Sequence, residues 1–238
     1  MIYLKSTELE PSSLRSPEET PGRVTSSSEI SNPQTFSCQT ILKQATADLK
    51  HTDPKVRILA IRYLEKADPC TAMPLLQEIL SDRDPRVREQ AISSLIKFRS
   101  SAVSPWIKKC LRDGDPGVRI AALRGMFKNR GPVDLNILLQ FLSDESAWVR
   151  RKVATLLGWT PMEGVLPILT ELSKDQDSRV RQAALFSLIT LYPEESEDRL
   201  VEAMGDPEPD LRKWARSTLE RMIAKPLKGR KASRADRG

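Results

Sequence analysis

The chain has 238 residues, enough for one large domain or two small ones, and aromatic residues make up only 5% of it. Few glycines and aromatics beside many Leu, Ile and Ala residues favour helices over sheets. No stretch approaches the roughly 18 consecutive apolar residues of a membrane span, and the start lacks the features of a secretory signal. We therefore expect a cytoplasmic protein with no membrane contact.

Residues suited to metal binding or acid–base catalysis are scarce. His51 is the only histidine, and Cys38, Cys70 and Cys110 lie far apart without a CxxC pair. We expect reduced, mostly buried thiols rather than a disulfide set or a zinc site. Imidazole is the commonest general base and metal ligand, so a single histidine without a partner argues against an enzyme. No metal and no cofactor are expected.

The two ends of the chain differ in charge from each other and in composition from the middle. Residues 1–37 are rich in Ser, Pro, Glu and Thr and carry a net charge of −2, whereas residues 225–238 carry +5 of the total of +6. Both segments hold too little apolar material to offset the cost of ordering the chain, so both are expected to be disordered tails. The folded domain is expected over residues 38–224.

The predicted helices of the middle region come in pairs. In chain order, the pairs are a helix near residues 40–50 and one from Pro54; "TAMPLLQEIL" and a helix from Pro85; "VSPWIKKCL" and a helix from Pro116; "LNILLQFL" and a helix from Ala147; "VLPILTEL" and a helix from Ser178; and a helix around Leu200 followed by one near residues 209–223. The second helix of each pair begins after an acidic or hydroxyl residue that can accept hydrogen bonds from the first-turn amides. Proline often follows, where its missing amide costs nothing.

These pairs repeat every 31 residues. An arginine after Val or Leu recurs at Arg57, Arg88, Arg119, Arg150, Arg181 and Arg212. Four residues before these arginines stand Asp53, Asp84, Asp115, Ser146, Asp177 and Glu208. The first helices keep their own apolar column of Leu76, Ile107, Leu138, Leu169 and Leu200. A period of this length indicates a solenoid, in which stacked neighbours complete a core that one pair cannot form alone.

The pattern D-P-x-V-R-x-x-A-x-x-x-L resembles HEAT repeats, and its short period is most similar to the subgroup named after phycobilisome lyases. The resemblance covers roughly residues 38–224 and implies an all-α superhelix of about six two-helix repeats. It also implies that the second helices line the concave side and that the aspartate and arginine columns form a polar ladder between repeats. The first and last helices are expected to act as caps with polar outer faces.

Repetition indicates that the aspartate and arginine columns are structural, because an active site is needed once whereas a joint is needed between every two repeats. The predicted ladder comprises Asp53, Arg57, Asp84, Arg88, Asp115, Arg119, Arg150, Asp177, Arg181 and Arg212. These arginines are therefore not counted as binding charges.

The exposed side of the second helices is the predicted binding surface. By helical spacing it includes the positions −2, +1, +2, +5 and +9 from each ladder arginine. The candidate residues are Lys97, Arg124, Lys128, Trp148, Arg151, Lys152, Trp159, Arg179, Phe186, Lys213 and Trp214. Exposed aromatics beside arginines are typical of binding hot spots. The anchor group is expected to comprise Trp148, Arg151, Lys152, Trp159, Phe186 and Trp214.

The sequence favours a non-enzymatic, monomeric scaffold or adaptor that binds a partner protein on this face. An alternative is nucleic-acid binding through the same basic and aromatic surface and the tail, since stacking rings and basic charge also suit single strands. A second alternative is a bilin-lyase-like subunit or a cofactor chaperone, because the lyase subunits share the repeat type. The deoxyhypusine-type hydroxylases of this fold hold iron with His-Glu pairs, which are absent here, so that activity is not expected. The partner, the pathway and the organism do not follow from the sequence.

Overall fold

The computed structural model describes residues 33–128 and 135–224, with side chains from Thr40 onward. Within these ranges the chain forms helices and turns and no strand, as expected for an all-α fold. The helices are α1 (Pro33–Asp48), α2 (Pro54–Leu64), α3 (Pro69–Ile79), α4 (Pro85–Lys97), the 3-10 turn η1 (Ser101–Val103), α5 (Ser104–Cys110), α6 (Pro116–Lys128), α7 (Leu135–Leu139), α8 (Ala147–Leu157), α9 (Val165–Leu172), α10 (Ser178–Leu191), α11 (Ser196–Ala203) and α12 (Pro209–Ala224).

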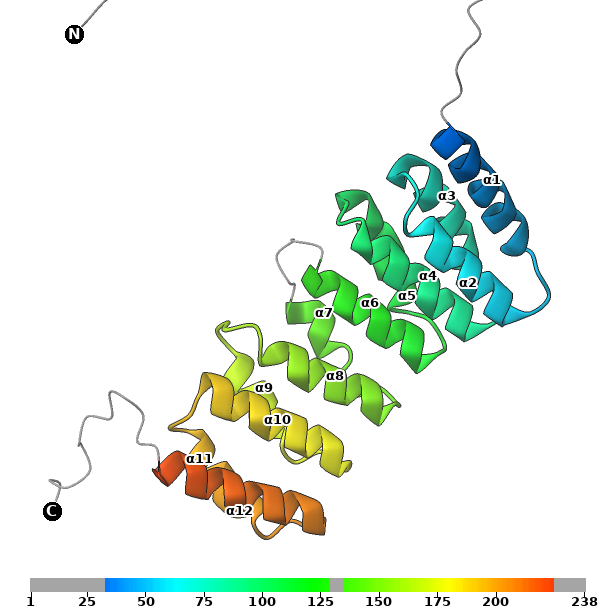
Figure 1. Ribbon diagram of the computed structural model, residues 1–238. Coiled ribbons are helices and arrows are strands. Elements are labelled where there is room, and N and C mark those ends of the chain that lie inside the picture. Colours follow the sequence, from blue (N-terminus) through cyan, green and yellow to red (C-terminus); the bar gives the residue numbers. More distant parts are fainter. Residues whose placement is uncertain (1–32, 129–134, 225–238) are drawn as a thin grey trace, which may run out of the picture.

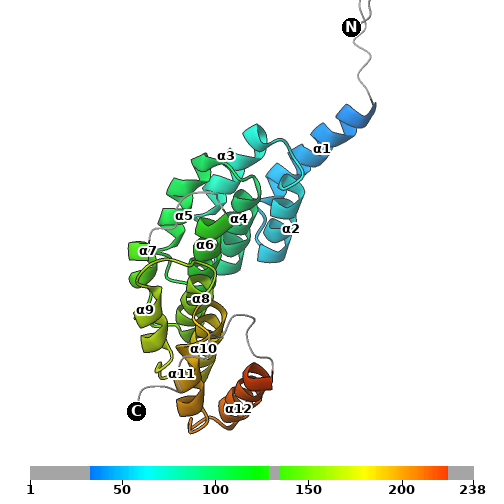
Figure 2. The same cartoon turned by 90° about the vertical axis from the view of Figure 1, so that its left-hand side faces the viewer.

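The helices stack in two layers along one axis. The even-numbered helices from α2 to α12 lie side by side in one layer, and the odd-numbered helices from α3 to α11 lie behind them (Figure 1). Turned by 90°, the stack is an arc whose ends, α1 and α12, reach toward the same side (Figure 2). The even-numbered helices therefore line the concave side of a six-repeat α-solenoid, which confirms the predicted fold class.

The second helices begin where the sequence places their N-caps. The carboxylate oxygen of Asp53, Asp84 or Asp177 accepts a hydrogen bond from the backbone amide two residues later, at 2.8–2.9 Å. Asp115 does the same for Gly117 at 2.8 Å. These bonds satisfy amides of the first turn that have no partner inside the helix. The aspartates four residues before Arg57, Arg88, Arg119 and Arg181 are therefore helix caps, whereas Ser146 begins α8 without a side-chain cap hydrogen bond.

The core runs continuously along the stack between the two layers. The first-helix column of Leu76, Ile107, Leu138, Leu169 and Leu200 is buried throughout, with exposed fractions of 0–3%. On the second helices, the residues three and seven after each arginine also pack into this core. Each repeat thus buries its apolar face against its own partner helix and against its neighbours.

Two joints between neighbouring second helices are unusually close because one side is a glycine. A Cβ atom on Gly125 of α6 would lie 2.4 Å from the Cδ1 atom of Ile96 on α4. A Cβ atom on Gly158 would lie 2.7 Å from the Cβ atom of Ser187 on α10. The Ser187 hydroxyl donates a 2.9 Å hydrogen bond across this second joint to the carbonyl of Ala154. The absence of a side chain therefore sets how closely the helices approach.

The two ends of the solenoid are less alike than expected. At the C-terminal end, Arg216 and Glu220 of α12 are exposed and hydrophilic, although Ile223 of the same helix is 62% exposed. At the N-terminal end, however, Ile41, Leu59 and Tyr63 are each about half exposed. The expectation of a polar outer face was therefore wrong at the N-terminal end. The physical reason is positional: the counterparts of Tyr63, such as Ser187, are buried against a preceding second helix, and α2 has none in the described part.

Two further expectations concern the ends of the folded region and the cysteines. Helix α1 begins at Pro33, inside the segment 1–37 that was expected to be disordered; residues 1–32 and 225–238 lie outside the described residues. Cys110 is buried, and burial raises the pKa of its thiol to about 11. Cys70 is exposed at the start of α3, contrary to the expectation of buried thiols. No helix in the described ranges is long and apolar enough to cross a membrane.

Candidate functional site

Five of the six ladder arginines, Arg57, Arg88, Arg119, Arg150 and Arg181, join two repeats through a shared set of four hydrogen bonds. The Nε and Nη2 atoms of Arg119 donate to both carboxylate oxygens of Asp144, at 2.9 and 2.8 Å. Its Nη1 atom donates to the carbonyls of Asp113 and Gly114, at 2.9 Å each. One guanidinium thus fixes the loop before its own helix and the equivalent loop of the next repeat. Such fork-to-fork pairing constrains orientation as well as distance.

The ladder carboxylates are not the cap aspartates that the sequence analysis assigned to the ladder. They form a separate column that lies six residues before each ladder arginine and accepts the arginine of the preceding repeat. The five pairs are Arg57–Asp82, Arg88–Asp113, Arg119–Asp144, Arg150–Asp175 and Arg181–Asp206, with shortest N–O distances of 2.6–2.8 Å. Their signal was present in the sequence, because this column is aspartate in all five copies.

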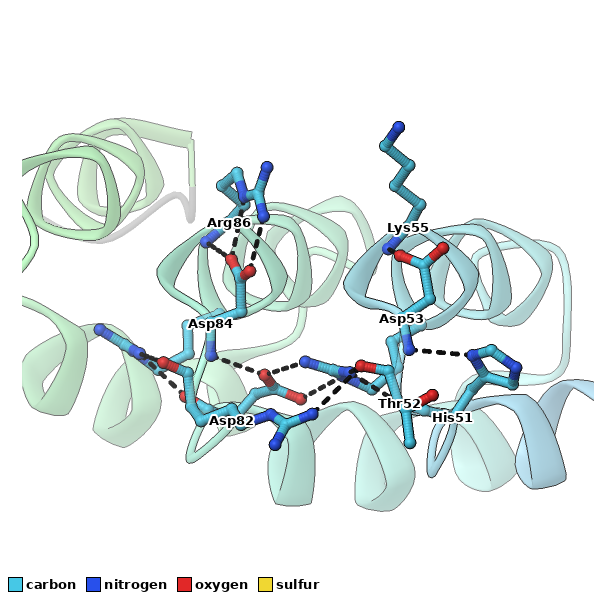
Figure 3. A network of polar contacts seen from close by, with 10 residues as sticks. His51, Thr52, Asp53, Lys55, Asp82, Asp84 and Arg86 are labelled. Carbon is cyan, nitrogen blue, oxygen red and sulfur yellow. Dashed lines mark hydrogen bonds and ion pairs between the residues drawn. The ribbon is translucent and has the colours of Figure 1, made fainter.

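His51 stands in the ladder-aspartate column of the first repeat. Its Nδ1 atom accepts a hydrogen bond from the backbone amide of Asp53 at 3.0 Å, just as the Oδ1 atom of Asp82 accepts one from Asp84 at 2.8 Å (Figure 3). The bond requires an unprotonated Nδ1 atom. The histidine therefore completes a loop turn at the start of the ladder, which gives it a structural role.

Among the described residues, the side chain of the last ladder arginine, Arg212, makes only the two hydrogen bonds to the loop of its own repeat. The Nη1 atom of Arg212 donates to the carbonyls of Asp206 and Pro207, at 2.7 and 3.0 Å. No carboxylate within the described part of the chain pairs with its fork. Arg212 thus holds its own loop but joins no further repeat.

The concave surface carries a large excess of positive charge. The five predicted columns place 30 residues on the second helices, and most of their side chains are exposed or partly exposed. Two of these residues are acidic, Glu89 and Asp210. Twelve are basic: Lys55, Arg62, Lys66, Arg86, Lys97, Arg124, Lys128, Arg151, Lys152, Arg179, Lys213 and Arg221. The surface is therefore suited to an acidic ligand.

Three of these cations are already paired within the chain. Lys97 donates to Glu65 at 2.6 Å, and Arg86 and Arg179 pair with the cap aspartates two residues before them at 2.7 and 2.6 Å. The Glu65 carboxylate also accepts hydrogen bonds from Gln90 and Ser94 of the next repeat. The predicted binding residues Lys97 and Arg179 are thus partly neutralised, and the sequence analysis missed Glu65 as the partner of Lys97.

Trp148 is the aromatic side chain most closely engaged with cations. It is the second residue of α8, and half of its surface is exposed. The guanidinium carbon of Arg179 lies 4.3 Å from its ring centroid, and that of Arg151 lies 5.6 Å away. Cation–π attraction holds such arginines over the ring face. Two neighbouring repeats therefore contribute to one exposed aromatic and basic site.

The structure does not gather the predicted anchor residues into one cluster. Trp148 is the second residue of α8, whereas Trp159 follows two residues after that helix ends at Leu157. Trp159 is 66% exposed and Phe186, on α10, is 62% exposed. Trp214 is only partly exposed, because it packs against the core at α12. The exposed aromatic surface is therefore carried by α8 and α10, and Trp214 is mainly a packing residue.

The remaining predicted residues include a group of cations at the α6–α8 joint. Arg124 of α6 and Arg151 of α8 are exposed, and Lys152 of α8 is partly buried. Burial lowers the pKa of Lys152, and the charges of Arg124 and Arg151 lower it further. Lys128 and Lys213 are exposed at the end of α6 and near the start of α12. In the described ranges no carboxylate lies within ion-pair distance of Arg124, Arg151 or Lys152.

Comparison with known proteins agrees with the architecture. The sequence matches the family model for HEAT repeats at residues 42–126, 103–189 and 135–220. No curated protein matches the sequence. Among solved structures, it is similar to the complex of CpcE and CpcF of phycocyanin lyase from Nostoc sp. PCC7120, with 20% identity, a TM-score of 0.51 and coverage of 86% of this chain and 79% of that one.

Two further solved structures have a similar fold. E. coli YibA is 20% identical with a TM-score of 0.57, over 86% of this chain and 80% of that one. Cex1p is 17% identical with a TM-score of 0.55, over 79% of this chain and 43% of that one. Identities this low describe the fold alone. The family model spans most of the chain and confirms the resemblance seen in the repeat pattern, so the chain belongs to the HEAT repeat family.

Proposed function

We propose that the chain is a non-catalytic binding protein whose concave surface holds an acidic segment of a partner protein. The observation that carries this proposal is the contrast on that surface between twelve basic and two acidic side chains, together with three large exposed aromatics. Charge complementarity would attract an acidic segment and fix its register. Trp148, Trp159 and Phe186 would supply contact area, because aromatic side chains dominate binding hot spots.

The solenoid scaffold suits such a role because the surface is preformed. Five bidentate ladder pairs fix the spacing of the repeats, so the concave residues keep their relative positions without a ligand. A rigid surface loses less conformational entropy on binding than a flexible one. The ladder thus contributes to binding through preorganisation.

The proposal can be tested with an acidic fluorescent peptide that contains glutamate and aromatic residues, measured by anisotropy with the full chain. We expect Arg124→Ala/Arg151→Ala to weaken binding about tenfold or more, as for truncation of central cationic residues. The matched control is Lys108→Ala/Lys109→Ala, which removes the same charge from exposed positions on α5 of the convex layer. Equal losses in the two double variants would mean that only net charge matters and would refute a concave site.

Nucleic-acid binding is the second candidate, and one specific observation favours it. The +9 column places Lys66, Lys97 and Lys128 one repeat apart along the concave side, as a track for a phosphate backbone would. The Glu65–Lys97 pair counts against this reading, because it occupies one cation of the track. A single-stranded oligonucleotide would bind with an affinity that falls steeply with salt, and Lys66→Ala/Lys128→Ala would reduce that slope.

A role as a lyase subunit or cofactor chaperone rests only on the shared repeat type. The resemblance to the phycocyanin lyase structure lies at 20% identity, which carries the fold and no residue of a site. Purification of the chain from its native source would test it. A bound pigment would favour the lyase reading over the acidic-segment reading.

A further inference from the structure

The cations at the α6–α8 joint lack the internal carboxylate that the α2–α4 joint provides. At the α2–α4 joint, the residue eight positions after the ladder arginine of the first repeat is Glu65, which accepts hydrogen bonds from Gln90, Ser94 and Lys97. At the α6–α8 joint the same position is Phe127, and the counterpart of Gln90 is Lys152. The third joint thus replaces an acid by an apolar ring and an amide by a cation.

Three positive charges therefore lie on two packed neighbouring helices, with Lys152 partly buried and Arg124 and Arg151 exposed. Arg124 comes from α6, and Arg151 and Lys152 come from α8. The pKa of Lys152 is lowered by its burial and then by the two arginines, so both guanidinium groups lie near enough to act on its ammonium group. Within the described residues no carboxylate pairs with any of the three. Like charges held together without a counter-ion destabilise the folded state unless a ligand supplies the anion.

Resting on the proposed function, we propose that Arg124, Arg151 and Lys152 form a subsite for the phosphate monoester of a phosphorylated serine or threonine in the acidic partner segment. A phosphate monoester carries a charge of about −1.5 to −2 at neutral pH and three strong acceptor oxygens. Two guanidinium forks and one ammonium group match that charge and number of acceptors. A single carboxylate would leave two of the three cations without an anion.

Trp148 forms the adjoining wall of this subsite. Arg151 reaches from the subsite to the Trp148 ring, with its guanidinium carbon 5.6 Å from the ring centroid. Arg179 lies on the same ring at 4.3 Å and is neutralised by Asp177, so it supports the ring and is not counted as a phosphate ligand. The residue next to the phosphorylated one would therefore contact an aromatic surface. This arrangement favours a peptide with a single concentrated dianion over a nucleic-acid strand, whose phosphates are spaced monoanions.

The test compares one acidic peptide in two forms, with phosphoserine and with serine at the same position, bound to the full-length chain. We expect the phosphorylated form to bind about tenfold tighter or more to the wild-type chain, the scale expected of charge-assisted hydrogen bonds. In Lys152→Gln the preference should fall to about twofold or less. Lys109→Gln, which removes an exposed cation of α5 on the convex layer, should keep the full preference.

Thermal unfolding without ligand provides a second readout that does not depend on a peptide. Lys152→Gln should raise the midpoint, because it relieves repulsion in the cluster, whereas inorganic phosphate should raise the midpoint of the wild type and not that of the variant. If Lys152→Gln fails to fold, Arg124→Gln at an exposed position replaces it in both measurements.

Each alternative result has a distinct meaning. Equal affinity of the two peptide forms for the wild type would overturn the phosphate subsite while leaving acidic-segment binding intact. Failure of both peptides to bind would refute the proposed function and the subsite with it. A single-stranded oligonucleotide that binds tighter than the phosphopeptide and loses affinity in Lys152→Gln would assign the cluster to nucleic acid instead. A lower midpoint for Lys152→Gln would contradict an unneutralised cluster.

Discussion

The repeat joints and the concave surface use the same residue types in opposite ways. At the joints, arginines are buried or nearly so and meet a carboxylate and backbone carbonyls, as Arg119 and Arg150 do. On the concave surface, Arg124 and Arg151 stand a few residues away on the same two helices and have no carboxylate partner in the described part of the chain. Saturation of its hydrogen bonds therefore distinguishes a structural arginine from a candidate binding arginine, whereas residue type does not.

The largest expected effect comes from removing the ladder arginine between two repeats. Arg119→Ala removes five hydrogen bonds, one of them to the exposed Glu145, and leaves the Asp144 carboxylate without its cation in a poorly solvated site. We expect a loss of about 3–5 kcal/mol in the free energy of unfolding, the range for breaking one side of a buried ion pair. Urea unfolding followed by circular dichroism measures it. Arg124→Ala, on the same helix, should change the value by no more than about 0.5 kcal/mol; comparable losses would remove the distinction between the two arginines.

A smaller effect is expected from widening the close α8–α10 joint. A Cβ atom at position 158 would lie 2.3 Å from the Oγ atom of Ser187 and 3.2 Å from its Cα atom, so Gly158→Ala must push the helices apart. We expect a loss of about 1–3 kcal/mol, as for overpacking elsewhere. Gly114→Ala is the matched control, because a Cβ atom there meets nothing within 4 Å. Partial recovery in Gly158→Ala/Ser187→Gly would assign the loss to this contact, and no recovery would contradict it.

Removing the last ladder arginine should lower the free energy of unfolding less than removing one from the middle of the ladder. Arg212 keeps the two carbonyl bonds of a ladder arginine and has no carboxylate partner in the described ranges. We expect Arg212→Ala to cost about 1 kcal/mol, the scale of ordinary hydrogen bonds at a partly exposed site. The same urea experiment measures it beside Arg119→Ala. A loss as large as that of Arg119→Ala would show that the bidentate carboxylate contributes little.

The smallest expected effect is a change in the response to acid. Burial raises the pKa of Asp113, but hydrogen bonds from Arg88 and the Asp115 amide outweigh it and lower the pKa overall. The pKa values of Asp175 and Asp206 are lowered in the same way, by hydrogen bonds from Arg150 and Arg181 that outweigh burial. Because the folded pKa lies below the unfolded one, this stabilisation is complete above the ordinary aspartate pKa of about 4 and is lost as the pH falls below it.

The measurement is the thermal midpoint between pH 7 and pH 3. The thermal midpoint of the wild type should stay nearly constant down to about pH 5 and fall steeply below pH 4. The double variant Arg88→Gln/Asp113→Asn should have a lower thermal midpoint at pH 7. Its midpoint should fall less steeply as the pH drops, because one ion pair has been removed. Parallel curves for the two proteins would mean that the joint aspartates do not carry the acid response.

Much of the ladder could be read from the sequence, and its one error is instructive. The 31-residue period located every ladder arginine, every cap aspartate and the buried leucine column. The acid partner was assigned to the cap column, although the aspartates at 82, 113, 144, 175 and 206 are identical in five copies. The Asp84 carboxylate accepts the Arg86 amide at its own helix start, whereas Asp82, two residues earlier in the loop, accepts the fork of Arg57 from the preceding repeat.

The binding surface was less predictable. Spacing identified which columns face the concave side, but it did not reveal that Lys97 is paired with Glu65 or that Trp214 packs against the core. Nor did it reveal that Trp148 lies in α8 whereas Trp159 follows two residues after that helix ends. Pairing of that kind depends on the neighbour contributed by the next repeat, which differs at every joint.

By itself, the sequence determined the repeat, the helix pairs, their caps and the buried columns, because these follow from local hydrogen bonding and from a period that every copy shares. Only the tertiary structure decided which cations are neutralised and which remain available. For Lys97 that outcome depends on a contact with Glu65, 32 residues away in the preceding repeat, and Phe127 in the place of Glu65 changes a satisfied joint into a candidate binding site.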